Sequence, residues 1–174
     1  MKKKQKMVRI QPSEAQLLKS VEYVVYEYAN LVSATAARQV APPINTHLQD
    51  AFLLSCRKLA GFFLTAKADV TQHDIVAEDF TESPQPYTLP EWQKWKIAMD
   101  KQLAHITWKR DKGWDGTPNK PLMDELQAAW RLFLSKLQLK FRGRFRDEIN
   151  KKKQCKGFEN LNFHEELIPA PKAN

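Results

Sequence analysis

The feature that most constrains the fold is a spacing of three and four residues between apolar side chains. In residues 13–38 it runs through Leu17, Val21, Val24, Val25, Tyr28, Leu31 and Val32. Such a spacing places side chains on one face of an α-helix. Ser13 and Gln16 have the spacing of a capping box, which indicates a helix start at Ser13. The two prolines at positions 42 and 43 end this helix.

Three further segments show the same periodicity: residues 45–67, 90–109 and 120–150. Thr88 and Glu91 give a second capping-box spacing, with Pro90 inside the first turn of the third helix. Gly143 weakens the far end of the fourth helix by about 1 kcal/mol relative to alanine.

No segment shows the alternation of a convincing β-strand. We therefore expect an all-α fold, an antiparallel bundle of four to five helices. The bundle domain spans residues 13–150. A basic tail, residues 1–12, precedes it, and a basic, irregular tail, residues 151–174, follows it.

Positive charge is concentrated near the two ends of the chain, whose formal net charge is +8. Residues 1–10 and 136–156 are rich in lysine and arginine, whereas the body between them is mildly acidic. This layout suits an anionic partner such as nucleic acid. The alternative is that the charged ends only keep the protein in solution.

No apolar run approaches the roughly 18 residues of a membrane-spanning helix. The basic start MKKKQK is not followed by an apolar segment, so we expect neither a signal peptide nor a membrane partner. A cytoplasmic location is the corresponding prediction.

The histidines do not have the spacing of a metal site. His47, His73, His105 and His164 are scattered, and none has an HxxxH partner. The two cysteines form no CxxC pair, and Cys56 lies in an apolar stretch where a small core residue is expected. We therefore expect no metal and no cofactor.

Three polar or aromatic residues are candidates for function. His105 adjoins the apolar stripe of the third helix, where it is either a buried neutral residue or a general acid or base. Arg57 lies among apolar residues in the second helix, where it either binds a phosphate or pairs with an acid such as Asp79 or Glu78. Trp114, in a glycine-containing loop, is a candidate for stacking on a base.

Several short stretches resemble the HEPN-like superfamily of helical-bundle proteins, in particular its bacterial and abortive-infection-type members. They are FLLSCRKLAGFF in the second helix, VAEDF in the connector and DKQLAHIT in the third helix. The resemblance implies an HEPN-like bundle and a homodimer. Active members are metal-independent ribonucleases that carry an arginine, a polar residue, three further residues and a histidine.

On this chain the histidine of that motif falls on His105, the polar position on Lys101 and the arginine position on Asp100. An acid cannot stabilise the developing negative charge of a phosphate. The resemblance therefore favours a non-catalytic or weakly catalytic protein that binds RNA or a nucleotide through Arg57, Lys101 and His105.

In this reading the basic C-terminal segment, with Arg142, Arg144 and Arg146, attracts the nucleic acid. Two alternatives stay open. One is a structural or protein-interaction bundle that dimerises, in which Arg57 and His105 only maintain packing. The other is an active metal-independent ribonuclease.

Overall fold

A computed structural model describes residues 9–40, 45–70, 74–104 and 119–170 of the chain. The fold is all-α, as predicted. The α-helices in these residues are α1 (Glu14–Val40), α2 (Asn45–Leu64), α3 (Pro90–Ala104), α4 (Asn119–Ser135) and α5 (Leu139–Lys153). Single 3-10 turns, η2 (Lys67–Asp69), η3 (Ala77–Asp79) and η5 (Glu165–Leu167), lie between or after them.

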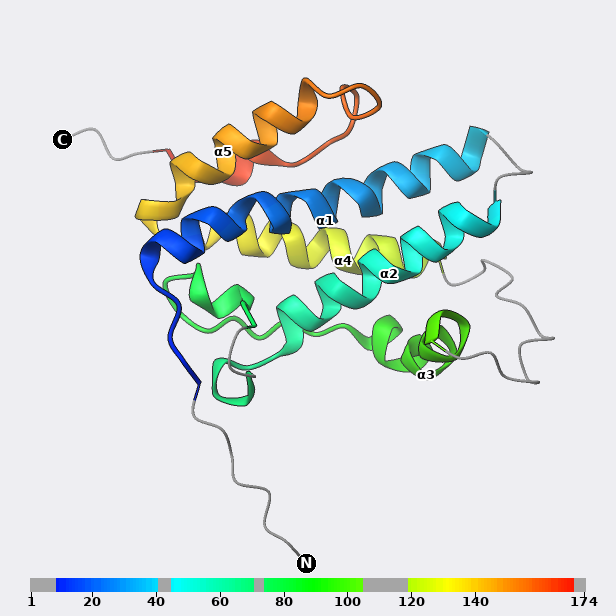
Figure 1. Ribbon diagram of the computed structural model, residues 1–174, viewed down its shortest axis with the longest axis horizontal. Coiled ribbons are helices and arrows are strands. Elements are labelled where there is room, and N and C mark those ends of the chain that lie inside the picture. Colours follow the sequence, from blue (N-terminus) through cyan, green and yellow to red (C-terminus); the bar gives the residue numbers. More distant parts are fainter. Residues whose placement is uncertain (1–8, 41–44, 71–73, 105–118, 171–174) are drawn as a thin grey trace, which may run out of the picture.

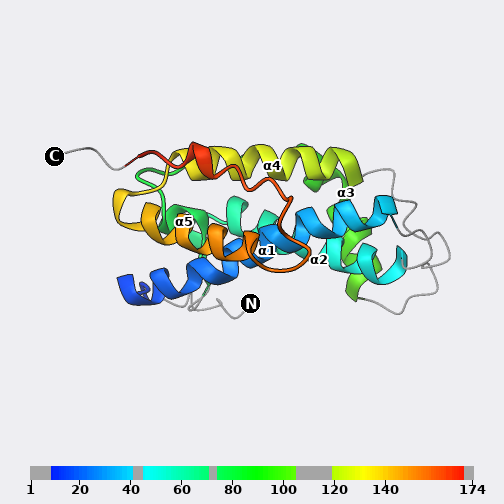
Figure 2. The same cartoon turned by 90° about the horizontal axis from the view of Figure 1, so that it is seen from above.

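Helices α1, α2, α4 and α5 run along the long axis of the molecule (Figure 1). Helices α1 and α2 form an antiparallel pair, and α4 lies behind them and runs in the direction of α2. Helix α5 packs against α1 and returns in the direction of α1. Helix α3 crosses the others near one end, as both views show (Figure 2).

The start of α1 confirms the predicted capping box. The Ser13 backbone N–H donates to Gln16 Oε1 at 2.7 Å, and the Gln16 N–H donates to Ser13 Oγ at 3.3 Å. These two bonds satisfy N–H groups that have no partner within a helix. The predicted apolar face is buried at Leu17, Val21, Val24, Val25, Tyr28 and Leu31.

The second predicted capping box is wrong. Helix α3 begins at Pro90, as expected, but the N–H groups of Glu91 and Trp92 donate to the two oxygens of the Glu125 carboxylate, both at 2.9 Å. Glu125 belongs to α4, so a long-range contact takes the place that local spacing assigned to Thr88. A carboxylate is well suited to this position because the N-terminal end of a helix carries partial positive charge.

The predicted fourth helix, residues 120–150, is divided into α4 and α5. Leu137 is fully buried between them and forms an isolated β-bridge with Thr81. The Gln138 N–H donates to the Phe80 carbonyl at 2.9 Å, and the Gln138 side-chain amide donates to the Thr81 carbonyl at 2.8 Å. These tertiary bonds replace helical ones, so the chain turns without a proline or glycine at the junction.

The core is rich in stacked and edge-to-face aromatic rings. Tyr28 stacks on Trp130 with ring centroids 4.2 Å apart, and Phe133 packs against Trp130 at 5.6 Å. The Trp130 indole N–H donates to the Phe163 carbonyl at 3.0 Å. Phe163 and Ile168, both buried, come from the segment expected as a tail, residues 151–174, so the chain is packed onto the bundle as far as Ile168.

Candidate functional site

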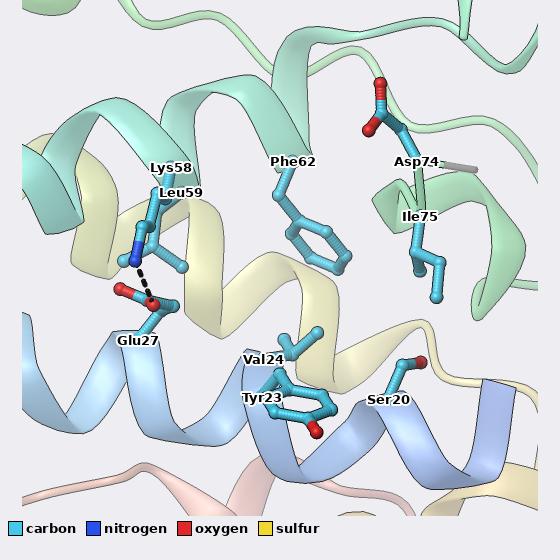
Figure 3. A pocket seen from close by; sticks show the side chains of 9 residues that line it. All are labelled: Ser20, Tyr23, Val24, Glu27, Lys58, Leu59, Phe62, Asp74 and Ile75. Atoms are coloured by element: carbon cyan, nitrogen blue, oxygen red, sulfur yellow. Dashed lines mark hydrogen bonds and ion pairs between the residues drawn. The ribbon is translucent and has the colours of Figure 1, made fainter. Parts of the chain in front are cut away.

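A groove runs along α2, between α1 and the segment 74–76 that follows η2. It consists of two adjoining pockets, of about 270 Å³ and 600 Å³. Both are lined by Lys58, Phe62, Asp74 and Ile75, which makes them parts of one hollow. Figure 3 shows the Phe62 ring and the Ile75 side chain extending toward α1.

The smaller pocket has apolar walls and a charged rim. The Lys58 ammonium reaches across from α2 to Glu27 on α1 and lies 2.6 Å from Oε1 (Figure 3). The Ser55 hydroxyl is 3.4 Å from the other oxygen of Glu27. Lys58 is about half-exposed, so its charge stays accessible from the groove. The exposed ring of Tyr23 lies beside this pair.

Arg57 lines the larger pocket, where it adjoins Lys58 in sequence. Its side chain is 50% exposed, and its Nε lies 3.4 Å from the Asp100 carboxylate on α3. Arg57 is therefore paired with an acid, as one interpretation held, but the expected partners Asp79 and Glu78 are wrong. The helix turns Arg57 outward, away from the apolar neighbours that precede and follow it in the sequence.

The far side of the larger pocket is open. Gly61 lies in its lining, and a methyl group added at Gly61 would meet nothing within 4 Å. Leu54 is 43% exposed at the same pocket.

Helix α5, which contains Arg142, Arg144 and Arg146, lies on the opposite side of α1 from α2 and α3 (Figure 1). Arg142 bonds to the Leu137 carbonyl and to Glu82, at 3.0 and 3.2 Å. Arg144 pairs with Glu148 at 2.8 Å, and Arg146 donates to the Ile168 carbonyl at 2.7 Å. The structure thus uses these side chains to hold α5 and the segment after it, and it does not bring them together with Arg57.

A buried charged cluster surrounds Asp79, and no local sequence pattern indicates it. The Arg9 guanidinium donates to both oxygens of Asp79, at 3.1 and 2.6 Å, and Lys67 Nζ lies 3.3 Å from Oδ1. The side chains of Arg9 and Asp79 are 8% and 1% exposed. The neighbours of Arg9 in the sequence indicate a basic tail, and no local spacing links Arg9 to an acid 70 residues away.

Opposing effects act on the pKa of Asp79. Burial raises it, but hydrogen bonds from Arg9 and from the Val76 N–H, with the charges of Arg9 and Lys67, outweigh burial and lower the pKa below its ordinary value of 3.8. The carboxylate is therefore charged at neutral pH and holds the segment before α1 against η3.

Several other candidate side chains lie outside the residues that the structure describes. His105 and Trp114 fall in residues that the structure does not describe, and so does the side chain of Lys101, a residue of α3. His164 is described, with its Nδ1 3.5 Å from Glu166. In the described segments, no three His, Cys, Asp or Glu side chains gather as metal ligands would.

Comparison of the chain with known protein families, with curated proteins and with solved structures finds no match in any of the three. No described helix has both the length and the apolar character needed to cross a bilayer. Functional inference therefore rests on the groove and its charges.

Proposed function

We propose that this chain is a cytoplasmic helical-bundle protein that binds RNA or a nucleotide in the groove along α2. The observation that carries the proposal is the pair of adjacent cations, Arg57 and Lys58, in the lining of a hollow whose walls are partly apolar and aromatic. Ligand sites commonly combine apolar walls with a few polar groups that fix orientation.

The two cations are available to a phosphate group. Ion pairs at such exposed positions contribute only about 0–1 kcal/mol, because water and salt screen them. A phosphate can therefore displace Asp100 from Arg57 at little cost and accept two N–H bonds from the guanidinium. Lys58, whose ammonium extends toward α1 whereas Arg57 extends toward α3, would contact a neighbouring phosphate as a point charge.

We expect the chain to have little or no catalytic activity. In the HEPN-like resemblance, which stays a proposal, Asp100 occupies the position where active members carry an arginine. Its carboxylate faces Arg57 and partly neutralises the positive charge that would stabilise a phosphate. An active ribonuclease would cleave RNA in EDTA and lose that cleavage in His105→Ala; we expect no such cleavage.

The test is a salt titration of the affinity for a fluorescein-labelled oligouridylate, measured by fluorescence anisotropy. We expect binding at about 50 mM salt that weakens strongly toward 200 mM. Arg57→Gln and Lys58→Gln should each weaken binding and reduce the slope of log K against log salt by about 0.7.

A matched control is Lys120→Gln on α4. Lys120 is exposed and lies 2.6 Å from Asp124, so its replacement also removes one cation and frees one acid, but outside the groove. It should leave the affinity nearly unchanged. If Lys120→Gln weakens binding as much as Arg57→Gln, the groove is not the site, and if the chain does not bind at low salt, the proposal fails.

A second candidate function, a protein-interaction bundle that dimerises, is favoured by a different observation. Ile97 on α3 is 68% exposed and Leu54 on α2 is 43% exposed, each one helical turn before a member of the Arg57–Asp100 pair. Sedimentation analysis tests it. If Ile97→Glu converts a dimer into a monomer, whereas Leu139→Glu at an exposed position of α5 does not, this function is supported.

A further inference from the structure

The outer face of α1 carries an aromatic ridge, which we define as Lys19, Tyr23 and Tyr26. Their spacing of four and three residues places them next to one another along the helix. Tyr23 is 62% exposed and Tyr26 is 45% exposed, and both are among the large apolar side chains that the fold leaves in solvent. Among the described residues, neither ring belongs to the buried core or to the partly buried side chains that pack against it.

The ridge joins the groove to α5. Tyr23 lines the smaller pocket together with Lys58, so one end of the ridge is part of the groove wall. At the other end, the Lys152 ammonium of α5 lies 4.9 Å from the centroid of the Tyr26 ring. Across the surface, Lys58 is therefore followed by the rings of Tyr23 and Tyr26 and then by Lys152.

The path carries unpaired lysines together with the acids Glu22, Glu27 and Asp74. In the described part of the chain, no carboxylate lies within ion-pair distance of Lys19 or of Lys152. Of the acids on this part of α1, Glu27 is already paired with Lys58, whereas Glu22 is exposed. Exposed rings flanked by lysines that have no acid partner are the composition of a surface that binds a single-stranded nucleic acid.

We propose that the aromatic ridge binds single-stranded nucleic acid by base stacking and extends the groove along α2. The inference rests on the proposed function and names its ligand class. Bases stack on Tyr23 and Tyr26, while Lys19 and Lys152 contact the backbone phosphates and Lys58 exchanges Glu27 for a phosphate. A double helix binds poorly, because its bases already stack on each other and their faces are closed to the tyrosines.

The experiment compares single-stranded oligouridylate with a duplex RNA of equal length, by anisotropy at low salt, for the full chain and four variants. Tyr23→Ala and Tyr26→Ala should each weaken binding of the single strand by about fivefold or more, the usual effect of losing one stacked base. Tyr23→Phe and Tyr26→Phe keep the ring and should retain the affinity within about twofold.

The outcomes separate this inference from the proposed function. If the full chain does not bind either RNA, both fail. If Arg57→Gln weakens binding but the two alanine variants do not, the groove stands and the ridge is overturned. The ridge is also overturned if duplex binds as well as single strand, or if the alanine variants change only the sedimentation of the protein, which would make the ridge a protein contact.

Discussion

At the scale of the residue, we expect a large loss of stability when Asp79 is replaced. Its side chain is 1% exposed, and Arg9, 8% exposed, depends on it for charge compensation. Removal of one member of a buried ion pair leaves the other charge without a partner in a poorly solvated place. Asp79→Asn should therefore lower the free energy of unfolding by about 3–5 kcal/mol, measured by urea denaturation.

The exposed acid Asp124, paired with Lys120, is the control for Asp79. Both members of this ion pair are well solvated, so Asp124→Asn should change the free energy of unfolding by less than about 1 kcal/mol. Equal effects of the two substitutions would contradict the buried pair.

The lowered pKa of Asp79 also predicts a pH dependence of stability. A group with a lower pKa in the folded state stabilises the fold at pH values above its unfolded pKa, and this stabilisation is lost as pH falls through the folded pKa. The contribution of Asp79 should therefore be complete at neutral pH and decline below its ordinary pKa of 3.8. The urea midpoint should be measured above and below that pH. As the pH falls, it should decrease less for Asp79→Asn than for the native chain.

At the scale of the element, the start of α3 depends on α4. Glu125→Ala removes the acceptor of two backbone N–H groups and should lower the free energy of unfolding by about 1–2 kcal/mol. Hydrogen exchange should accelerate at Glu91 and Trp92. Asp124→Ala, one residue away on the exposed side of α4, is the control, and faster exchange in α3 with that variant would contradict the assignment.

In helix α5, we expect a substitution that stabilises the protein. Gly143 lies inside the helix on its exposed side, and an added methyl group would meet nothing within 4 Å. Gly143→Ala should raise the free energy of unfolding by about 0.5–1 kcal/mol, because alanine loses less backbone freedom on folding. A thermal melt with no increase in midpoint would show that the α5 backbone is not helical there.

The sequence predicted elements well where the signal is local and poorly where it is not. The apolar face of α1, its capping box and the Pro90 start of α3 follow from neighbours within four residues. The division between α4 and α5 depends on Thr81, and the cap of α3 depends on Glu125. These partners are distant in sequence, and periodicity alone cannot identify them.

The candidate site likewise contains residues with a local sequence signal and residues that only tertiary packing brings together. Arg57 is recognisable in the sequence because a cation among apolar residues is unusual, but its partner Asp100 lies on another helix. Lys58 and Tyr23 carry no local signal, and only the packing of α1 against α2 makes them walls of one pocket. The sequence pattern of the α5 arginines indicates a free basic segment, although each arginine forms a hydrogen bond or an ion pair within the fold.

At the scale of the whole molecule, the C-terminal segment belongs to the packed body. Phe163 is fully buried, and its carbonyl accepts the Trp130 indole bond. Phe163→Ala should lower the free energy of unfolding by about 3–5 kcal/mol in urea denaturation, because it leaves a cavity beside Trp130 and Tyr28. Asn160→Ala, at an exposed position of the same segment, should have little effect; a similarly small effect of Phe163→Ala would contradict this packing.

The central claim is that the groove along α2, with the adjoining face of α1, binds RNA. Its most direct test is the titration of ¹⁵N-labelled protein with oligouridylate, followed by amide chemical shifts. We expect the shifts to concentrate at residues 19–27 and 57–62, with residues 124–132 of α4 nearly unchanged. No shifts at low salt, or shifts confined to α4, would contradict the claim.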